Sequence, residues 1–458
     1  MPVEACERGG LIGGENPTEL TLTGIAAIHH KAHQTSKSWL NPGGLRHQIR
    51  QDGGFLRTRW KGAAPMSRPS LLSHRAIALQ PSLTLAISAR AAALKQEGRD
   101  ICSMSAGEPD FGTPEFIVEA AIKALRDGVT RYGPAAGDPA LREAIANKLT
   151  RDNRIPSSAA NVLVTNGGKQ AIFNLFQVVL NPGDEVLIPS PFWLSYPEMA
   201  RLAGADSVMV PSAAEDGFRL DLAALEAAIT PRTRLLVINT PGNPTGRVSD
   251  RQELESLAAL VRRHPQLLVM SDEIYEYLLD EGETHHSFSA IAPDLADRTF
   301  VVNGFAKGWA MTGWRLGYLA GDHQVIKAAA ALQSQSTSNV CSFAQRGALA
   351  ALTGSWDCVR TMAASYNDRR QHLVKGLQAI QGLTLVPPRG AFYAFPKLPD
   401  SVSGSMQFCE TALEREGLAL VPGLAFGDDR CIRLSCAVSH ETIDDALQRL
   451  ARLLVSER

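Results

Sequence analysis

From about residue 169 the chain alternates helical segments with short, unbroken runs of apolar residues. The runs are EVLIP (185–189), RLLVINT (234–240), QLLVMS (266–271) and RTFVVN (298–303), and helical stretches such as DRQELESLAALVRR (250–263) separate them. Strands of continuous Val, Leu and Ile are buried on both faces, which is typical of parallel strands covered by helices on either side. The pattern therefore predicts an α/β domain with a mostly parallel sheet flanked by helices.

The segments on either side of this region predict a smaller α+β domain. After about residue 345 come a long helix (365–380), the short strands TLVPP (384–388), AFYAFP (391–396) and CIRLSC (431–436), and a last helix (441–454). We expect residues 106–345 to form the large domain. We expect residues 71–105, which include the helical stretch LTLAISARAAALKQEG (83–98), to join residues 346–458 in the small domain.

Residues 1–70 differ from the rest of the chain, because they are rich in Gly, Pro and charge and lack a sustained apolar period. We expect this segment to be a disordered N-terminal extension. The early acids Glu4 and Glu7 argue against an organellar transit peptide, and there is no apolar core typical of a signal peptide. An alternative is that the working start of the protein is Met66.

The charge balance argues against several classes of function. Lys and Arg number 46 against 47 Asp and Glu, so no net field favours nucleic acid or a membrane surface, and no apolar run approaches the roughly 20 residues of a membrane span. The seven cysteines form no CxxC pair, which favours reduced thiols in a cytoplasmic enzyme and disfavours a zinc site. Small molecules are therefore the expected ligands, without nucleic acid, membrane or metal.

Polar side chains follow three of the predicted strands at the points where they end. RLLVINT is followed by Asn243, QLLVMS by Asp272 and Tyr275, and RTFVVN by Lys307. Ligands of open α/β sheets bind outside the carboxyl ends of the strands, so an amide, a carboxylate, a phenol and an amine are expected to meet at one edge. Each has an ordinary explanation alone, since Asp272 could cap a helix and Lys307 could be a surface lysine. Their shared placement favours a catalytic site.

An anion-binding feature lies nearby in the predicted fold. Gly167 and Gly168 precede the helix KQAIFNLFQVVL (169–180), whose first backbone N–H groups can bind a phosphate, and Arg315 supplies a permanent bidentate donor. A nucleotide-binding loop is a weaker alternative, because TNGGK lacks the GxxxxGK[ST] pattern. An anion cradle together with an amine and a carboxylate suggests pyridoxal 5′-phosphate, a phosphorylated aldehyde that a lysine holds as a Schiff base.

Longer stretches around these residues resemble one family. Asn243-Pro-Thr-Gly, Ser271-Asp-Glu-Ile-Tyr275 and Lys307-Gly-Trp-Ala-Met-Thr-Gly-Trp-Arg315 look like the class I/II aminotransferases of fold type I, as do SAGEPDFGTPE (105–115) and RYGPAAGDPALREAI (131–145). The resemblance runs from about Leu71 to the C-terminus. Within the family, QPSLTLAISARA (80–91) and GGKQA (167–171) are similar to bacterial aspartate aminotransferases, some of which also use prephenate.

The resemblance implies a role for each residue of the reaction centre. Lys307 would hold the cofactor as a Schiff base and then move a proton between the substrate Cα and the cofactor C4′. Asp272 would pair with the pyridine nitrogen and keep it protonated, so that the ring accepts carbanion electrons. Tyr275 and Asn243 would hydrogen-bond the phenolic oxygen of the ring, and Trp193 would stack on the ring face.

For the phosphate, the resemblance implies a mixed set of ligands. They are the amides around Gly167, Gly168 and Lys169, the guanidinium of Arg315, and Tyr132 from a second subunit. The protein is therefore expected to be a homodimer. The commonest pattern has a serine three residues before the lysine, where this chain has Gly304. One neutral hydrogen bond is worth about 1 kcal/mol, so the phosphate is still expected to bind.

For the substrate, the resemblance implies two anion-binding positions. The implied residues are Gly107 and Arg433 for the α-carboxylate, Lys169, Thr84 and Ser82 for a distal carboxylate, and Trp193 and Asn243 beside them. A cation in a closed site selects an acidic side chain, because it would otherwise be buried unpaired. Gln80 departs from the Lys or Arg of this subgroup, which bears on the use of prephenate.

The chain is therefore predicted to be an aspartate:2-oxoglutarate aminotransferase that works by a ping-pong mechanism. Alternatives with the same cofactor are a prephenate/glutamate or aromatic aminotransferase and a C–S lyase of the same fold, and Lys169 argues against the lyase. A ligand-sensing regulator with a DNA-binding domain is a further alternative. It is disfavoured because residues 1–70 contain no helix-turn-helix pattern.

Overall fold

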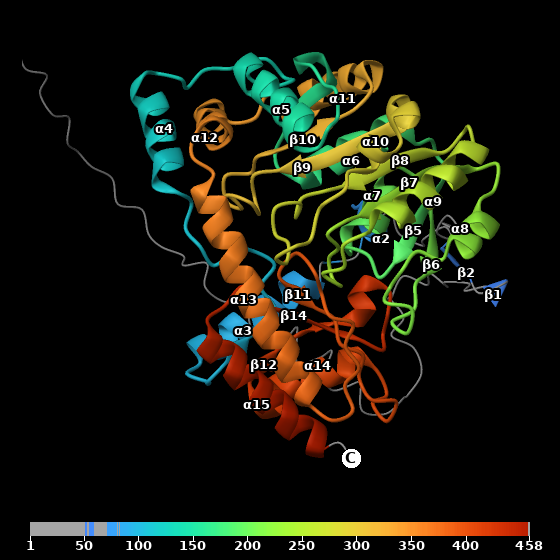
Figure 1. The fold of residues 1–458 in the computed structure, drawn as a ribbon, viewed down its shortest axis with the longest axis vertical. Coiled ribbons are helices and arrows are strands. Elements are labelled where there is room, and N and C mark those ends of the chain that lie inside the picture. The colour runs from blue at the N-terminus through green and yellow to red at the C-terminus, as the bar shows by residue number, and fades with distance from the viewer. Residues whose placement is uncertain (1–50, 53–54, 59–70, 80, 82, 457–458) are drawn as a thin grey trace, which may run out of the picture. The chain divides into compact units, whose positions relative to one another are not determined.

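The computed structural model describes residues 51–52, 55–58, 71–79, 81 and 83–456. Within these residues the largest feature is a nine-stranded sheet with the order β1-β2-β6-β5-β7-β8-β9-β10-β4 (Figure 1). In that order the strands are Gln51–Asp52, Phe55–Thr58, Asp206–Pro211, Glu185–Ser190, Thr233–Asn239, Leu268–Asp272, Thr299–Gly304, Gly317–Ala320 and Val162–Thr165. The four apolar runs of the sequence form the strands β5, β7, β8 and β9.

The centre of the sheet is parallel, which confirms the predicted α/β class. Strands β6, β5, β7, β8 and β9 pair in parallel, so their carboxyl ends meet at the same edge of the sheet. Strand β10 runs antiparallel between β9 and β4, and β2 runs antiparallel to β6. The five parallel strands therefore have an antiparallel strand on each side, β10 next to β9 and β2 next to β6.

Helices cover both faces of this sheet. Val237 of β7 packs in one core with α6 and α7, while its neighbour Leu236 packs in a second core with α8 and α9. Burial on both faces explains why these strand sequences are continuously apolar. The helices of this part of the chain are α4 (Glu115–Arg126), α5 (Pro139–Asp152), α6 (Gly168–Val179), α7 (Ser195–Leu202), α8 (Leu222–Ala228), α9 (Arg251–Arg263), α10 (Phe288–Ile291), α11 (His323–Ser336) and α12 (Ser342–Thr353).

A second group of elements is built around two small sheets. One sheet has the order β11-β14-β13, with strands Tyr393–Ala394, Ile432–Ser435 and Val421–Pro422, and the other pairs β12 (Leu418–Ala419) with β3 (Cys102–Ser103). The accompanying helices are α3 (Leu83–Gln96), α14 (Ser405–Glu416) and α15 (His440–Ser456). Helix α2 (His74–Ala78) instead lies beside α7, where Arg201 donates to the Ala78 carbonyl oxygen at 2.6 Å. Because β3 pairs in parallel with β12, the segment before residue 105 lies beside the C-terminal part of the chain.

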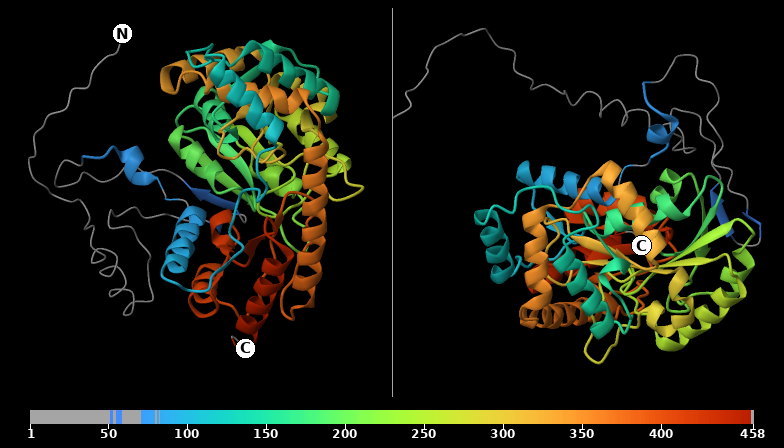
Figure 2. Two further views of the ribbon diagram at one scale, coloured as in Figure 1. Left: turned by 90° about the vertical axis from the view of Figure 1, so that its left-hand side faces the viewer. Right: turned by 90° about the horizontal axis from the view of Figure 1, so that it is seen from above.

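The long helix α13 (Asp357–Ala379) packs against both groups of elements (Figures 1 and 2). Near its start Val359 is buried in a core on the large-sheet side, and further along Tyr366 and Leu373 are buried in the core of the small sheets. In Figure 2, left, it is the orange helix that runs beside the large sheet and down to the red C-terminal elements. No helix in the described part of the chain, α13 included, is long and apolar enough to cross a membrane.

One local expectation from the sequence does not hold. TLVPP is not a strand, because only Thr384 forms an isolated bridge to Lys397, and the prolines at 387 and 388 have no N–H to donate to a ladder. Of the N-terminal segment for which we expect disorder, the structure describes residues 51–52 and 55–58, and the rest lies outside the described residues. The described residues form β1 and β2, and β2 pairs with β6, which would otherwise be the edge of the sheet. An edge strand offers unpaired N–H and C=O groups, which this short segment uses.

Candidate active site

Asn243, Asp272 and Lys307 line one cavity of ≈ 720 Å³. The cavity lies where β7, β8 and β9 end, since the parallel register sets Asn239 beside Asp272 and Asp272 beside Val302. Nine other residues named from the sequence also line it: Thr84, Gly107, Gly167, Gly168, Lys169, Trp193, Tyr275, Arg315 and Arg433. The large sheet and the small sheets therefore contribute to one site.

Two of the residues named from the sequence are not placed at this cavity. Tyr132 is 93% exposed and does not line it in this chain. Ser82 lies outside the described residues. The neighbouring Thr84 lines the cavity, and its hydroxyl Oγ1 is buried without a hydrogen-bond partner among the described residues.

Lys307 lies in the turn that follows β9, and its side chain is half-buried at the cavity. Nζ donates a hydrogen bond to the carbonyl oxygen of Gly107 and lies 5.7 Å and 5.4 Å from the ring centroids of Tyr275 and Phe392. Burial lowers the pKa of Lys307 to about 8, although the Glu108 carboxylate acts in the opposite direction. Because a neutral amine is the nucleophile, this lysine is better suited to attack a carbonyl near neutral pH than an exposed lysine is.

Asp272, the last residue of β8, is buried and holds one strong hydrogen bond. The Tyr196 hydroxyl donates to Asp272 Oδ2 at 2.6 Å, and the Ile274 N–H donates to Oδ1 at 3.3 Å. Burial raises the pKa of Asp272 to about 6, against the effect of the Tyr196 hydrogen bond. A cation placed against this carboxylate would favour its ionised form.

Tyr196 is a site residue that the sequence reasoning missed. It lies in the first turn of α7, three residues after Trp193, and the two rings meet edge to face at a centroid distance of 5.4 Å. Trp193 lies just before the N-cap of α7 and Tyr196 in its first turn, so their nearness in the sequence was the available signal. The missed hydroxyl orients the carboxylate that the sequence did identify.

The anion cradle is formed by the start of α6 and Arg315. Gly167 caps the helix at φ +78°, and a Cβ at this position would lie 2.6 Å from Arg315 Nη2. Glycine is therefore required here both by the backbone conformation and by the approach of the guanidinium. Arg315 donates to the carbonyl oxygens of Thr312 at 2.8 Å and Asn166 at 3.4 Å. Among the described residues it has no acidic partner, so its charge is available to an anion.

Arg433, on β14, is a second cation without a carboxylate partner among the described residues, and unlike Arg315 it is buried. It is 2% exposed, and it donates to Asn243 Oδ1 at 3.1 Å and to the Ser105 carbonyl oxygen at 2.9 Å. Its Nε has no hydrogen-bond partner among the described residues, and its guanidinium carbon lies 4.5 Å from the ring centroid of Tyr393. Burial lowers the pKa of Arg433. A buried guanidinium with an unused donor is expected to bind a carboxylate of a ligand.

The family model that matches this chain is aminotransferase class I and II, over residues 99–450. The chain belongs to this family. An aspartate/prephenate aminotransferase of Thermus thermophilus is 47% identical over 390 residues, which cover 84% of this chain and 98% of that protein. A Petunia hybrida protein named bifunctional aspartate aminotransferase and glutamate/aspartate-prephenate aminotransferase is 46% identical, over 84% of this chain and 83% of its own length.

Solved structures agree with this assignment to the class I and II aminotransferases. The aspartate aminotransferase of Thermus thermophilus with maleate matches with a TM-score of 0.80 and 46% identity, over 84% of this chain and 100% of that one. The aspartate aminotransferase of Rhizobium meliloti matches with a TM-score of 0.82 and 38% identity, over 84% and 99%. The fold is therefore fold type I, and the activity of this chain is amino-group transfer with pyridoxal 5′-phosphate.

The cavity of this aminotransferase has the groups that pyridoxal 5′-phosphate requires. The cradle at Gly167 and Arg315 suits a phosphate, Lys307 offers an amine of lowered pKa for the aldehyde, and Asp272 offers a buried carboxylate for the pyridine nitrogen. The site lacks the serine hydroxyl expected at position 304, where Gly304 belongs to β9 and a Cβ would lie 2.8 Å from Gly317 Cα. Glycine at this position is explained by the close approach of β10.

Lys169 and Trp193 lie together at this cavity of the aminotransferase. Lys169 Nζ is 5.0 Å from the ring centroid of Trp193, a cation–π contact that holds the amine beside the cradle. Burial lowers the pKa of Lys169, and the like charge of Arg315 lowers it further. Two cations so close to each other favour an anion between or beside them.

Tyr275 and Asn243 are held by the small-sheet side of the cavity. The Tyr275 hydroxyl lies 3.0 Å from the hydroxyl of Tyr393, a residue that the sequence reasoning did not name. Asn243 is fixed by the hydrogen bond from Arg433 and by its own N–H, which donates to Asn239 Oδ1 at 2.9 Å. Both side chains are therefore positioned by bonds that cross from the large sheet to its neighbours.

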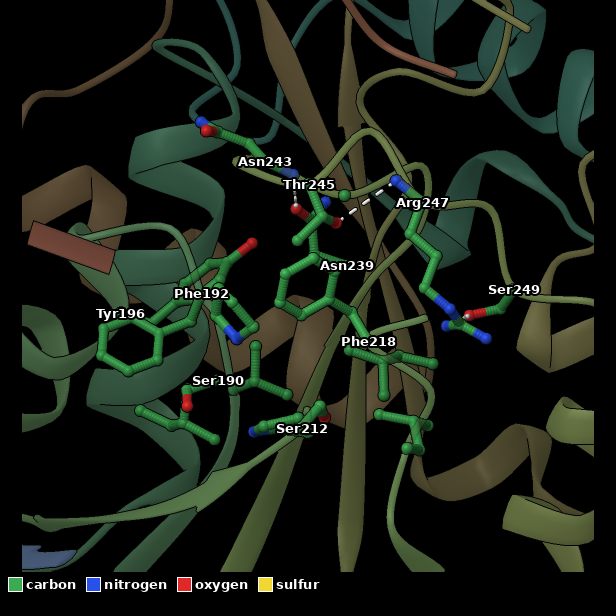
Figure 3. A pocket seen from close by; sticks show the side chains of 17 residues that line it. Ser190, Phe192, Tyr196, Ser212, Phe218, Asn239, Asn243, Thr245, Arg247 and Ser249 are labelled. Atoms are coloured by element: carbon green, nitrogen blue, oxygen red, sulfur yellow. Dashed lines mark hydrogen bonds between the residues drawn. The ribbon is translucent and has the colours of Figure 1, made fainter. Parts of the chain in front are cut away.

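A smaller cavity of ≈ 60 Å³ lies beside the main one and shares Tyr196, Asn239 and Asn243 with it. Figure 3 shows that hydroxyls and amides line it, among them Ser190 at the end of β5 and Ser212 just after β6. In the segment that follows Asn243, Arg247 donates its backbone N–H to Thr245 Oγ1 at 3.2 Å (Figure 3). The volume suits water rather than a cofactor.

Proposed function

We propose that this aminotransferase moves an amino group between aspartate and 2-oxoglutarate. The observation that carries the proposal is the presence of two cations for a dicarboxylate in one cavity, Arg433 with its unused Nε and Lys169 beside the cradle. The unsatisfied hydroxyl of Thr84 lines the same cavity and adds a donor for a distal carboxylate. The names of the Thermus and Petunia relatives, and the maleate in the Thermus structure, support an acidic substrate.

The side chains divide the work of binding and proton transfer. When bound, pyridoxal 5′-phosphate supplies a ring that stabilises negative charge developing at the substrate Cα. Lys307 removes the proton from that Cα. The buried carboxylate of Asp272 stabilises the protonated pyridine nitrogen. Arg433 orients the substrate α-carboxylate, with Gly107 opposite it. Trp193, Tyr275 and Asn243 fix the plane of the ligand ring.

Three further features complete the proposed enzyme. The elements of residues 71–105 and 346–458 would close on the substrate as a small domain and carry Arg433 inward, which excludes water and strengthens each charge contact. The protein would be a homodimer in which the exposed Tyr132 reaches the phosphate of the partner's site. The enzyme would act in the cytoplasm, where its described cysteines stay free.

A spectral half-reaction tests the proposed function. Adding aspartate to the loaded enzyme is expected to remove the visible absorbance of the lysine-bound cofactor, and 2-oxoglutarate is expected to restore it. The two steps occur separately because the amino group is held by the cofactor between them. Loss of absorbance without restoration would contradict 2-oxoglutarate as the acceptor, and no response to aspartate would contradict the proposed donor. A C–S lyase would instead keep its absorbance with aspartate, which has no C–S bond to break, and would release a thiol from a sulfur-containing amino acid.

Prephenate is the second candidate substrate, alongside glutamate and aromatic donors. The relatives named for both aspartate and prephenate favour it. The same assay separates the candidates. If the distal carboxylate site is used, enzyme that has been aminated by aspartate should recover its absorbance faster with prephenate than with phenylpyruvate. Equal rates for the two acceptors would mean that Lys169 does not determine substrate specificity.

The substitution Lys169→Ala is expected to weaken acidic donors selectively. One charge-assisted contact is worth about 1.5–3 kcal/mol, so kcat/KM for aspartate and glutamate should fall roughly 10- to 100-fold, and that for alanine and phenylalanine should change about threefold or less. Single-turnover half-reactions with each donor measure these values.

The cofactor affinity of the same variant must be measured in parallel, because Lys169 also lies beside the phosphate cradle. A matched control is Lys327→Ala, which removes an exposed lysine of α11 that does not line the cavity. If acidic donors lose no more than apolar donors, Lys169 serves the cofactor alone and the distal-carboxylate assignment is wrong.

A further inference from the structure

A buried cluster of charged and polar side chains lies behind Asp272 and Tyr275, on the side away from the cavity. Its members are Lys148 and Asn153 at the end of α5, Ser271 of β8, Glu273 and Glu276 of the turn that follows, His285 and Ser287 of the loop before α10, and Asn303 of β9. Lys148 is 2% exposed, Glu273 0% and Glu276 5%. Burial of an ion costs several kcal/mol unless it is paired, so the pairing within this cluster matters.

Glu273 is the centre of one half of the cluster. Its Oε1 accepts hydrogen bonds from Ser271 at 2.8 Å and Ser287 at 2.6 Å. Its Oε2 accepts from Asn153 Nδ2 at 3.3 Å and lies 3.0 Å from His285 Nε2. The carboxylate is therefore held by four side chains, of which His285 is the one that can carry a positive charge.

Glu276 is the centre of the other half. Its Oε1 accepts from Asn303 Nδ2 at 2.6 Å and from the Lys148 ammonium, and its Oε2 accepts from Asn153 Nδ2 at 2.7 Å. Lys148 also donates to Asn153 Oδ1 at 2.7 Å, so Asn153 links the two carboxylates. With these donors in place a metal ion at Glu273, Glu276 and His285 would have to displace them, which disfavours metal binding.

The two carboxylates alternate with the two site residues along one turn. Glu273 directly follows Asp272, and Glu276 directly follows Tyr275. Asp272 and Tyr275 line the cavity, whereas Glu273 and Glu276 face the cluster. The turn is also tied to the sheet by the Glu273 N–H, which donates to the Val302 carbonyl oxygen at 2.9 Å. A change in either carboxylate therefore moves the backbone that carries the neighbouring site residue.

The charge of the cluster depends on His285. Two carboxylates and one ammonium leave one negative charge, and a protonated imidazole brings the sum to zero. We propose that His285 is a positioning residue, whose imidazolium neutralises Glu273 and holds the turn from Asp272 to Tyr275 in the geometry that presents both side chains to the cofactor. The inference rests on the proposed roles of Asp272 and Tyr275.

Glu273 favours the protonated form of His285, although the second ring nitrogen, Nδ1, is buried without a hydrogen-bond partner among the described residues. Burial alone would lower the pKa of His285, but the charge and hydrogen bond of Glu273, with a smaller effect from Glu276, outweigh burial and the Lys148 ammonium and raise it. On the Glu273 side burial acts to raise the pKa, and the His285 charge with the hydrogen bonds from His285, Ser287 and Ser271 lowers it. From β10, Tyr318 faces the same carboxylates, and burial first and then their charges raise the pKa of its phenol, which stays neutral.

The pH dependence follows from these directions. A histidine whose pKa is raised on folding contributes fully below its ordinary pKa of about 6.5, and the contribution is lost as pH rises through the raised value. Above that value Glu273 becomes a buried carboxylate without its cation. The site should therefore keep its alignment below the ordinary pKa of histidine and lose it as the pH rises through the raised pKa of His285.

Binding of pyridoxine 5′-phosphate, an alcohol that cannot bond covalently to Lys307, tests the proposal by calorimetry on the cofactor-free enzyme. We expect His285→Gln to weaken binding roughly 10- to 100-fold, which corresponds to about 1.4–2.7 kcal/mol. The double variant Glu273→Gln/His285→Gln removes the charge together with its partner and should bind within about threefold of wild type, which the coupling of neighbouring residues predicts. The matched control is His286→Gln, next in sequence but outside the cluster, which should bind as wild type does.

The pH profile of the same binding gives a second readout. As pH rises through the raised pKa of His285, wild-type affinity should fall more steeply than that of the double variant, which keeps the titration of Lys307 but has no imidazolium. If His285→Gln binds like His286→Gln, or if the double variant is as weak as the single one, the imidazolium does not act through Glu273. If His285→Gln does not fold, the wild-type profile and the double variant still decide. Asp272→Asn separates the two claims, since normal binding by that variant would contradict the proposed role of Asp272 itself.

Discussion

Replacing Lys307 with alanine is expected to lower kcat by at least about 10⁴-fold, because the change removes both the amine that binds the cofactor covalently and the base that moves the Cα proton. The lowered pKa of about 8 makes this amine reactive near neutral pH, and the partner of Nζ is a backbone carbonyl rather than an acid. The measurement is steady-state turnover with aspartate and 2-oxoglutarate, accompanied by cofactor content after dialysis.

The fold should survive this substitution, because the lysine makes no ion pair among the described residues and its removal relieves the cost of burying a charge. The cradle at Gly167 and Arg315 remains, so the variant should still bind cofactor, more weakly than wild type. Lys307→Arg, which keeps the charge, should lose as much turnover as Lys307→Ala. A kcat within about tenfold of wild type in either variant would assign the chemistry to another residue.

Replacing Asp272 with asparagine is expected to lower kcat roughly 10³-fold, a size typical of the loss of one preorganised charge contact in a closed site. The carboxylate is the group that would keep a ring nitrogen protonated, and an amide of the same shape cannot do so. Single-turnover half-reactions with aspartate measure the loss at the proton-transfer stage.

The free energy of unfolding shows whether the loss of kcat in Asp272→Asn comes from misfolding. Burial raises the pKa of Asp272 to about 6. The contribution of Asp272 to the free energy of unfolding of the cofactor-free chain therefore falls as pH rises from about 4 to 6. Above that window the ionised carboxylate opposes folding. Asp272→Asn without cofactor should therefore unfold at pH 7 no more easily than wild type. Tyr196→Phe, which removes one donor from Asp272, should cost only about tenfold in kcat. Equal losses in the two variants would mean that the hydroxyl, not the charge, is essential.

The sequence was most informative at the ends of the central strands. Continuous apolar runs predicted β5, β7, β8 and β9, and the parallel register then placed the residues that follow them at one edge. Asp272 and Lys307 could be predicted because Asp272 ends its strand and Lys307 lies in the turn after its strand, and Arg433 because it stands within a motif of the family. The positions of these residues were set by local sequence and by a simple sheet rule.

Contacts between distant segments could not be predicted from the sequence. Tyr393 meets Tyr275, and His285 meets Glu273, across loops whose course depends on tertiary packing rather than on any period in the sequence. TLVPP carries apolar residues like those of a strand, but its two prolines cannot donate ladder hydrogen bonds. Strand β10 has only four residues, and it is defined by its neighbours β9 and β4 on either side.

The most direct test is borohydride reduction of the loaded enzyme, followed by digestion and mass analysis of the peptide that carries the reduced cofactor. The amine at position 307 is expected to hold the added mass, and aspartate added before reduction is expected to abolish the labelling, because the cofactor then leaves the chain with the amino group. A label on Lys169 or on any other lysine, or no label at all, would contradict the proposal that Lys307 and Asp272 act on one cofactor ring.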